Sequence, residues 1–554
     1  MNCNIASRLT EMAQLAPHRP ALIEPERATR VGRRRERVLS FAELDQQSNR
    51  LAAGLQRMGV TPGMKLVLFV PFSQEFVSLT FAIYKAGATV ILIDPGMGRT
   101  NIFQCLNEVR PDGFIAVPIV HAVRWFSGTI VRRAAFNVSV GPWLPGVKAT
   151  FRQLDRTTSH EFRPAQTQAT DSAAIIFTSG STGPPKGVHY EHGMFDAQVE
   201  LIRERYQIAP GEVDLPGFPL FGLFNAAMGV TTVIPDMDPT RPAQVDPVKM
   251  ISAIQKYEVT QAFGSPAFWN RVGRYCDENK VQLPQLKRAL SAGGPVPGHV
   301  LERMNRVLSR PGADLYTPYG ATESLPISSI GASEVLSSTA PLTKNGAGTC
   351  VGNLFSGMSV KIIPITEGPL ASLDDVAELA PGEVGEIIVS GPSVTREYYL
   401  RPDATRLAKI PDGDRFWHRV GDVGYFDEQG RLWFCGRKAH IVQTQEVRMF
   451  SVCCEAIFNE HPTIYRSALV GIGTAGSQKP VIVVEPEQGE YPATQEEERK
   501  LIGELLALGQ AHPKTQSISE ILLHPALPVD TRHNVKINRE ALAVWAAGQL
   551  KNRS

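Results

Sequence analysis

Apolar residues recur with a helical period in the first clear pattern of the chain. Between Leu39 and Met58 this spacing places Leu44, Leu51 and Leu55 on one side. The serine at position 40 precedes the pattern, and a serine hydroxyl can accept a hydrogen bond from the free backbone N–H groups at a helix start. The pattern therefore predicts an amphipathic helix that begins just after this serine.

Short apolar runs then alternate with helical patterns along the chain. Strand, helix and strand patterns follow one another at 65–71, 76–86 and 89–94, and again at 259–264, 266–276 and 289–294. Strands that alternate with helices are typical of a parallel sheet that is covered on both faces. The chain is therefore predicted to have an α/β fold.

The pattern changes after Gly382, where short strands and turns follow one another without long helices. Residues Asp427–Gly430 are predicted to form a hairpin turn. A chain of 554 residues is too long for a single hydrophobic core. We place a boundary at Gly436–Ala439, which gives an N-terminal domain of residues 1–436 and a smaller C-terminal α/β domain of residues 437–554.

The composition excludes several classes of protein. A net charge of +2 gives no overall attraction to nucleic acid. The seven cysteines are scattered and odd in number, which fits a reducing compartment. No apolar run is long enough for a transmembrane segment, and residues 1–16 lack the pattern of a signal peptide. We therefore expect a cytoplasmic protein.

One segment, Val117–Gly146, is rich in valine, tryptophan, phenylalanine and arginine and has no clear period. Three alternatives fit this composition: a flap over an apolar substrate entrance, a peripheral contact with a membrane, and irregular packing in the core. The sequence leaves all three open.

The strongest candidate for chemistry is the loop that follows the apolar run Ala173–Phe177. The loop offers hydroxyls, small residues and one lysine, in the order Thr178, Ser179, Gly180, Ser181, Thr182, Gly183, Pro184, Pro185 and Lys186. Such a loop suits the binding of a phosphate, although it is not a Walker A loop because a proline precedes the lysine. The alternative is a flexible Gly/Ser linker, but linkers seldom follow directly on a buried strand.

Three further motifs follow the loop along the chain: Tyr319–Glu323, Asp422 after a glycine, and Gly436-Arg437. Together these motifs resemble the adenylate-forming superfamily of acyl-CoA synthetases, peptide-synthetase adenylation domains and luciferases. The resemblance extends over roughly residues 39–540. It implies an adenylate-forming enzyme fold, with a large N-terminal domain of several α/β subdomains and a small mobile C-terminal α/β domain. It also implies ATP and Mg²⁺ as cofactors.

The resemblance implies roles for the matching residues. The implied nucleotide-binding residues are Thr178, Ser179, Gly180, Ser181, Thr182, Gly183 and Lys186 of the phosphate loop, Gly293 and Gly294 beside adenine, Tyr319, Gly320, Ala321 and Thr322, and the ribose-binding pair Asp422 and Arg437. Glu323 is the implied Mg²⁺ ligand, a hard oxygen donor for a hard cation. Lys536 is the implied lysine that contacts the carboxylate and the α-phosphate. The candidate catalytic residues are Lys536, Glu323, Thr178 and Lys186.

The implied first step is attack of a substrate carboxylate on the α-phosphorus of ATP, which gives acyl-AMP and pyrophosphate. Two departures from the family pattern bear on the substrate and on the second step. Glu446 stands where enzymes that make CoA thioesters usually carry glycine, so we expect an obstructed thiol route. Gly222 stands where an aromatic residue or histidine is usual, so we expect a more open acyl side.

Within the superfamily, the segments GRKAH…VRMF and VDTRHNVK resemble the branch that makes β-lactones in bacterial long-chain olefin biosynthesis. This implies that the acyl-AMP of a long-chain 2-alkyl-3-hydroxy fatty acid is attacked by its own 3-hydroxyl, and that other enzymes of the olefin pathway are partners. His189 and His192 are candidates for the base. The alternatives are a long-chain fatty acyl-CoA synthetase, a fatty acyl-AMP ligase, and a catalytically silent relative that binds ATP or lipid.

Overall fold

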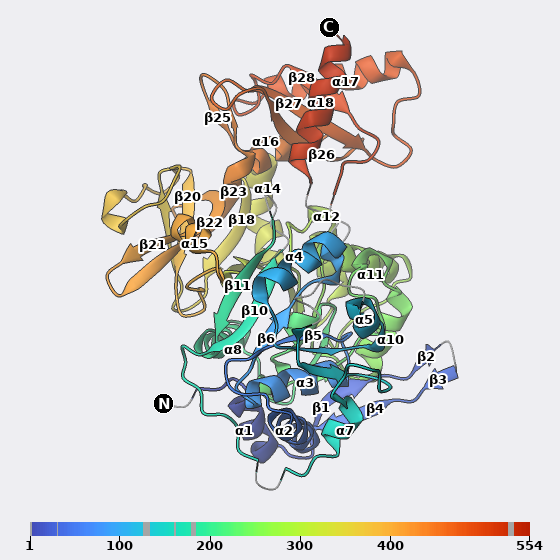
Figure 1. Cartoon of the computed structure of the whole chain (residues 1–554). Coiled ribbons are helices and arrows are strands. Elements are labelled where there is room, and N and C mark those ends of the chain that lie inside the picture. Colours follow the sequence, from blue (N-terminus) through green and yellow to red (C-terminus); the bar gives the residue numbers. More distant parts are fainter. Residues whose placement is uncertain are drawn as a thin grey trace.

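The computed structural model describes residues 3–29, 32–125, 133–159, 162–178, 184–529 and 537–553. Within these ranges the strands form a fourteen-stranded, a seven-stranded and a three-stranded sheet, together with two small two-stranded sheets. The C-terminal residues, drawn in red in Figure 1, form a separate body next to the larger part of the chain. The predicted α/β fold is confirmed.

The first predicted helix is α2 (Phe41–Arg57). It starts where the sequence placed it, because Ser40 and Glu43 form a capping box in which each side chain bonds the other's backbone N–H. Its buried face packs against α3 (Gln74–Lys85). Lys85 of α3 is buried as well, and its Nζ lies 2.7 Å from Asp45 Oδ1 on α2. This contact supplies the partner that a buried charge requires.

The seven-stranded sheet has the order β11-β10-β6-β5-β7-β8-β9. Its strands are β5 (Lys65–Phe69), β6 (Thr89–Leu92), β7 (Gly113–Ala116), β8 (Phe136–Ser139), β9 (Ala149–Thr150), β10 (Ser172–Thr178) and β11 (Lys186–Glu191). Every neighbouring pair is parallel except β10 and β11. Helix α3 covers one face, and α4 (Arg99–Val109) covers the other. This confirms the parallel sheet that the alternating pattern predicted.

The fourteen-stranded sheet combines a parallel part with an antiparallel part. Its strands are β1 (Pro20–Glu24), β4 (Arg37–Ser40), β12 (Val213–Pro216), β13 (Thr231–Val233), β14 (Gln261–Phe263), β15 (Arg288–Leu290), β16 (Asp314–Ala321), β17 (Ser324–Gly331), β18 (Thr349–Leu354), β19 (Ser359–Ile363), β20 (Gly385–Ser390), β21 (Lys409–Asp412), β22 (Arg415–Phe426) and β23 (Leu432–Arg437). Strands β12 to β16 pair in parallel, and β16 to β23 pair antiparallel. The predicted turn at Asp427–Gly430 joins β22 to β23.

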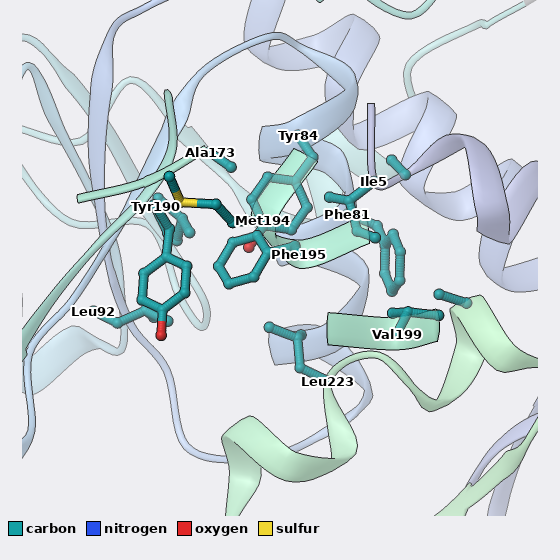
Figure 2. Packing of buried hydrophobic residues seen from close by; sticks show 14 of the residues in the cluster. Ile5, Phe81, Tyr84, Leu92, Ala173, Tyr190, Met194, Phe195, Val199 and Leu223 are labelled. Carbon is teal, nitrogen blue, oxygen red and sulfur yellow. The ribbon is translucent and has the colours of Figure 1, made fainter. Parts of the chain in front are cut away.

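The helices of the larger part fill the space around the two sheets. They are α1 (Ser7–Leu15), α5 (Pro118–Trp125), α7 (Phe151–Asp155), α8 (His192–Tyr206), α9 (Pro219–Gly222), α10 (Pro247–Lys256), α11 (Pro266–Glu278), α12 (Gly298–Val307), α13 (Ala332–Glu334), α14 (Ala340–Lys344) and α15 (Pro402–Ala408). Helix α8 contacts β11 of one sheet and β17 of the other. The cluster in Figure 2 lies around it, where the rings of Tyr190 and Phe195 stack with centroids 4.7 Å apart.

The C-terminal body follows directly on β23. It contains the small hairpin β24 (Val442–Gln443) and β25 (Arg448–Met449), the sheet β26 (Ile464–Ile472), β27 (Lys479–Pro486) and β28 (Glu520–Leu523), and helices α16 (Ser451–Phe458), α17 (Gln495–Gln510) and α18 (Arg539–Arg553). Its two hydrophobic cores are built from its own residues. A third cluster joins Cys435 of β23 to Cys453 of α16. Because this cluster spans the predicted domain boundary at Gly436–Ala439, that boundary stays a prediction.

The segment Val117–Gly146 has two roles in the described residues. Helix α5 lines the large cavity described below, whereas β8 is an ordinary strand of the seven-stranded sheet. Residues 126–132, between them, lie outside the described part. No helix in the described ranges is both long enough and apolar enough to cross a membrane.

Candidate active site

Residues that follow strands of both large sheets line one connected cavity of about 3460 Å³. Loops after the carboxyl ends of parallel strands are the usual ligand sites of such sheets. Small-molecule sites commonly measure about 300–1,000 Å³, so this cavity has room for more than a nucleotide. Of the predicted site residues, Lys186, Gly293, Gly294, Tyr319, Gly320, Ala321, Thr322, Glu323, Asp422 and Arg437 all line it.

The predicted ribose-binding pair is assembled by strand pairing. Asp422 of β22 lies opposite Arg437 of β23, and Arg437 Nη1 is 2.9 Å from Asp422 Oδ1. The hydroxyl of Tyr319 donates to the other carboxylate oxygen of Asp422 at 2.6 Å. Burial raises the pKa of Asp422, and the charge of Arg437 opposes this rise. The carboxylate lies between the Tyr319 hydroxyl and the charge of Arg437, at the cavity wall.

Two glycines of the predicted nucleotide site allow the backbone to adopt a path that a side chain would prevent. Gly293 follows β15 and has φ of +97°, a conformation that L side chains rarely adopt. A Cβ on Gly320 would lie 2.7 Å from the backbone oxygen of Ser324. Both positions therefore require glycine for the chain to follow this path.

The predicted Mg²⁺ ligand, Glu323, is held by a residue that the sequence analysis missed. The hydroxyl of Tyr398 donates to Glu323 Oε1 at 2.7 Å. The ring of Tyr398 also lies beneath Lys186, whose Nζ is 4.9 Å from the ring centroid. Tyr398 therefore joins the predicted carboxylate to the predicted phosphate-loop lysine. Nothing in its spacing within the sequence signalled this position.

A second missed residue, Lys409, lies behind Glu323. It is 8% exposed, and its Nζ donates to the backbone oxygen of Thr395. The N–H of Thr395 in turn donates to the backbone oxygen of Glu323 at 2.9 Å. Burial lowers the pKa of Lys409 to about 7, although the negative charge of Glu323 opposes the shift. A buried lysine on a short strand carries no sequence signal.

The chemistry of Glu323 fits a Mg²⁺ ion that is held mainly by a nucleotide. In the described ranges no group of three or more His, Cys, Asp or Glu side chains is placed to bind a metal. Mg²⁺ in phosphate-transfer sites is commonly bound by one or two carboxylates, with phosphate oxygens and water completing the shell. A single carboxylate, that of Glu323, is therefore a sufficient protein ligand for such a Mg²⁺ site.

Several predicted site residues lie outside the described part: Ser179, Gly180, Ser181, Thr182, Gly183, Lys536 and the side chain of Thr178. Their neighbours are placed. Thr178 and Lys186 pair across β10 and β11, so the phosphate loop starts and ends beside the cavity. Val529 and Ile537 form a bridge and both line the cavity. The segment that carries Lys536 therefore also leaves from and returns to the cavity wall.

The two candidate bases for the second step are wrong. His189 and His192 are both absent from the cavity wall. His189 already contacts Glu397 Oε1 at 2.9 Å through one ring nitrogen and Ser172 Oγ at 2.8 Å through the other. His192 is fully buried, and burial lowers its pKa to about 4. Both histidines follow the phosphate loop in sequence, but the strand and helix turn them away from it.

The expectation that Gly222 opens the acyl side is also wrong. Gly222 is buried at the end of α9, where a Cβ would lie 2.5 Å from Pro216 Cγ and 3.3 Å from Phe72 Cζ. The position is closed by these neighbours, and glycine is needed for them to pack. The next residue towards the N-terminus, Phe221, stacks on Phe263 with ring centroids 3.8 Å apart.

Glu446 is exposed in the turn between β24 and β25 and does not line the cavity. The expected obstruction by Glu446 therefore stays a prediction.

The fold and this site define an AMP-binding enzyme. Residues 9–399 match the family described as AMP-binding enzyme, and the chain belongs to that family. Among solved structures, the fold is similar to ATP-bound MatB from Rhodopseudomonas palustris, with a TM-score of 0.78, 20% identity and coverage of 98% of this chain and 99% of that chain. It is also similar to the amide bond synthetase McbA from Marinactinospora thermotolerans, with a TM-score of 0.77, 21% identity and the same coverage. The predicted adenylate-forming fold is confirmed.

The sequence is much more similar to two olefin beta-lactone synthetases. It is 44% identical to that of Xanthomonas campestris pv. campestris, over 99% of this chain and 98% of the relative. It is also 44% identical to that of Stenotrophomonas maltophilia, over 100% of this chain and 99% of the relative. The resemblance to the β-lactone branch is thereby confirmed. A long-chain-fatty-acid–CoA ligase of Salmonella typhimurium is 25% identical over 81% of the chain and of the relative.

Proposed function

We propose that this chain activates a long-chain 2-alkyl-3-hydroxy fatty acid with ATP and closes the product to a β-lactone, in olefin biosynthesis. The observation that carries this proposal is the 44% identity to two olefin beta-lactone synthetases over almost the whole chain. The assembled nucleotide site supports it, because an enzyme that had lost activity would be free to lose the contacts of Asp422 and Glu323.

In the first step a carboxylate oxygen of the substrate attacks the α-phosphorus of ATP. A new P–O bond forms between the carboxylate and the α-phosphorus. The bond between the α-phosphorus and the oxygen that joins it to the β-phosphorus breaks, and pyrophosphate leaves with the electron pair. Asp422 and Arg437 are proposed to hold the ribose, and Lys186 to face the phosphates. Lys536 is proposed to bring a positive charge to the transferring phosphoryl group. Glu323 would hold Mg²⁺, which would supply further charge neutralisation.

In the second step the 3-hydroxyl oxygen attacks the acyl carbon of the same molecule. The new C–O bond closes a four-membered ring, the C–O bond to the phosphate breaks, and AMP leaves. The hydroxyl proton passes to solvent or to AMP. Because the nucleophile is tethered to the acyl group, it acts at a high effective concentration, which helps to offset the ring strain. The step needs neither an external thiol nor a thiol tunnel.

The cofactors proposed are ATP and Mg²⁺, and the partners proposed are the acid and other enzymes of the same pathway. The seven free cysteines support a reducing compartment, and hence the cytoplasmic location that we propose. The second candidate function is a long-chain fatty acyl-CoA synthetase, which the similarity to the Salmonella typhimurium ligase favours.

The test is the mass of the product made from ATP, Mg²⁺ and a 2-alkyl-3-hydroxy acid, with and without CoA. We expect AMP, pyrophosphate and a product that is lighter than the acid by one water, at a rate that CoA does not change. The matched control is the same 2-alkyl acid without the 3-hydroxyl, which should stop as enzyme-bound acyl-AMP. A CoA thioester as the main product would establish the ligase instead.

A further inference from the structure

The cavity extends beyond the nucleotide site into two apolar arms. The first, here called the α8 arm, is lined by Val199, Ile202, Tyr206, Leu223, Phe224 and Met228. The second, here called the α4 arm, is lined by Phe69, Ile93, Ile102, Phe103, Phe114 and Val120, and the guanidinium of Arg124 lies over the Phe114 ring. Both belong to the same connected cavity. Apolar walls of this kind suit hydrocarbon chains rather than a nucleotide.

The two arms lie in different parts of the fold. The α8 arm is in the core around α8, where Figure 2 shows Phe195, Val199 and Leu223 in one cluster. The α4 arm lies at the carboxyl edge of the seven-stranded sheet, where β5, β6 and β7 end beneath α4 and α5. Its walls come from a separate hydrophobic cluster that includes Ile93, Leu106 and Phe114. The two arms are thus lined by different elements and by different hydrophobic clusters.

The α4 arm has an apolar rim at the molecular surface. Ile119 and Val123 of α5 line the cavity and are 68% and 41% exposed, respectively. Trp125, at the end of the same helix, is 38% exposed. Exposed apolar residues at the edge of an apolar channel are typical of a site that receives an apolar ligand. The arm is therefore open to a chain that extends from the active site towards the surface.

Phe72 lies on the cavity wall beside the short helix α9 and packs against the hydrophobic cluster around α8. This ring lines the cavity, makes an edge-to-face contact with Phe76 at 5.9 Å, and lies against the site of a Cβ on Gly222. Leu220 and Phe221, on the same short helix as Gly222, also line the cavity. The absence of a side chain at residue 222 therefore allows Phe72 to pack at this part of the cavity wall.

From this geometry we propose that the two arms hold the two alkyl chains of one branched substrate, one chain in each. This inference rests on the proposed function, because a 2-alkyl-3-hydroxy acid carries one chain at C2 and another beyond C3. Each methylene that moves from water into an apolar arm strengthens binding about fourfold. Two arms therefore let the enzyme bind both chains out of water while the carboxylate and the 3-hydroxyl stay together at the nucleotide.

The experiment uses a matched pair of substitutions, Ile102→Trp in the α4 arm and Ile202→Trp in the α8 arm. Both isoleucines are partly buried helix residues that line the cavity. Three acids are compared by kcat/KM for AMP release: one long only at C2, one long only beyond C3, and one long on both sides. We expect the kcat/KM of each variant to fall about tenfold or more with one of the two single-chain acids and to change little with the other. The affected acid must differ between the variants, and both variants must lose activity with the doubly long acid.

The urea midpoint of each variant is the control for folding, because it is measured without a substrate in either arm. If Ile102→Trp fails this control, Val120→Phe narrows the α4 arm from its other wall, and Val199→Phe is its partner in the α8 arm. Loss with the same single-chain acid in both variants, or equal loss with all acids, would overturn the proposal. If AMP is released but no lactone forms, only the proposed function is overturned. The proposal of two arms is tested by the rate of AMP release and does not depend on the lactone.

Discussion

At the scale of single residues, the contact between Tyr398 and Glu323 is the clearest addition to the predicted site. The phenol occupies one oxygen of the carboxylate, so it fixes the direction in which the other can reach a cation. Groups that orient a metal ligand typically change metal affinity or activity by about 10–100-fold when they are removed. We therefore propose that Tyr398 is a positioning residue for Glu323.

We predict that Tyr398→Phe raises the Mg²⁺ concentration needed for half-maximal pyrophosphate release by about tenfold or more, because Glu323 loses its orienting donor. Tyr399→Phe is the matched control, since the hydroxyl of Tyr399 instead contacts Lys65 Nζ at 3.3 Å. A magnesium titration of pyrophosphate release compares the two variants. Equal half-saturation in Tyr398→Phe and in the wild type would show that the contact does not position the carboxylate.

The packing at Gly222 gives a prediction about stability. Gly222→Ala would place a Cβ 2.5 Å from Pro216 Cγ, a ring carbon that cannot move away by changing rotamer. Overpacking of this kind costs about 1–3 kcal/mol of unfolding free energy. Gly298→Ala is the control, because nothing lies within 4 Å of its added Cβ. Urea unfolding measures both, and an unchanged midpoint for Gly222→Ala would contradict the tight packing.

At this scale, the sequence predicted residues that belong to ordered motifs, and it missed residues that act through contacts with distant parts of the chain. Asp422 and Arg437 belong to motifs with a known order along the chain, and the structure places them opposite each other. Tyr398 and Lys409 act through contacts with residues distant in sequence, so no local pattern marks them. His189 and His192 failed as candidate bases because closeness in sequence to the loop says nothing about the direction of a side chain.

At the scale of elements, the start of α8 carries a buried histidine. His192 is 0% exposed and lies edge-on against Tyr84, with ring centroids 5.7 Å apart. Burial lowers its pKa from 6.5 to about 4, and the charge of Asp171 opposes that shift. The folded protein therefore keeps the ring neutral at pH values where an unfolded chain would protonate it.

This gives a pH dependence with a definite sign. As pH falls below about 6.5, the unfolded state gains the proton first, so stability is lost until the folded histidine also titrates near pH 4. At pH 5 the loss from His192 is about 2 kcal/mol. We predict that His192→Gln narrows the difference in urea midpoint between pH 7 and pH 5. A variant with the same or a larger difference would contradict the assignment.

Helices and strands were easier to predict from the sequence than the two arms of the cavity. The period of Leu44, Leu51 and Leu55 located α2, and its capping box fixed the start. Alternating patterns located the strands, because parallel strands with both faces covered are short and apolar. The α4 arm was not predicted, because the ends of β5, β6 and β7 meet α4 and α5 only when the sheet has formed.

At the scale of the whole molecule, the C-terminal body contributes to the wall of the cavity. The two residues that flank the segment with Lys536 lie there. Val529 and Ile537 line the same cavity as Lys186 and Glu323. We predict that Lys536→Ala lowers pyrophosphate release by about 10²–10³-fold while ATP still binds, because it removes charge stabilisation in the transition state. Lys500→Ala is the control, at a side chain that is 77% exposed. Near-wild-type release by Lys536→Ala would refute the role given to this lysine.

The two bodies also touch at a second contact. Lys344 Nζ of α14 lies 3.0 Å from Glu460 Oε2, which follows α16, and Lys514 Nζ donates to the backbone oxygen of Gly346 at 2.5 Å. Exposed ion pairs contribute little free energy, so this contact does not prevent the C-terminal body from turning. It does provide a place at which turning can be blocked by a covalent link.

A lock at this contact distinguishes the two proposed second steps. Lys344→Cys and Glu460→Cys, joined by a short bis-maleimide, would hold the present arrangement; their side chains are 60% and 41% exposed, and each single-cysteine variant serves as control. A CoA ligase that must turn its C-terminal domain to admit the thiol would stop at acyl-AMP. An enzyme whose nucleophile is the substrate's own 3-hydroxyl needs no such turn. We therefore predict that the linked protein completes one turnover to lactone in a quenched single-turnover experiment, at a rate within about tenfold of the unlinked variant. Accumulation of acyl-AMP in the linked protein would show that the second step requires the domain to move.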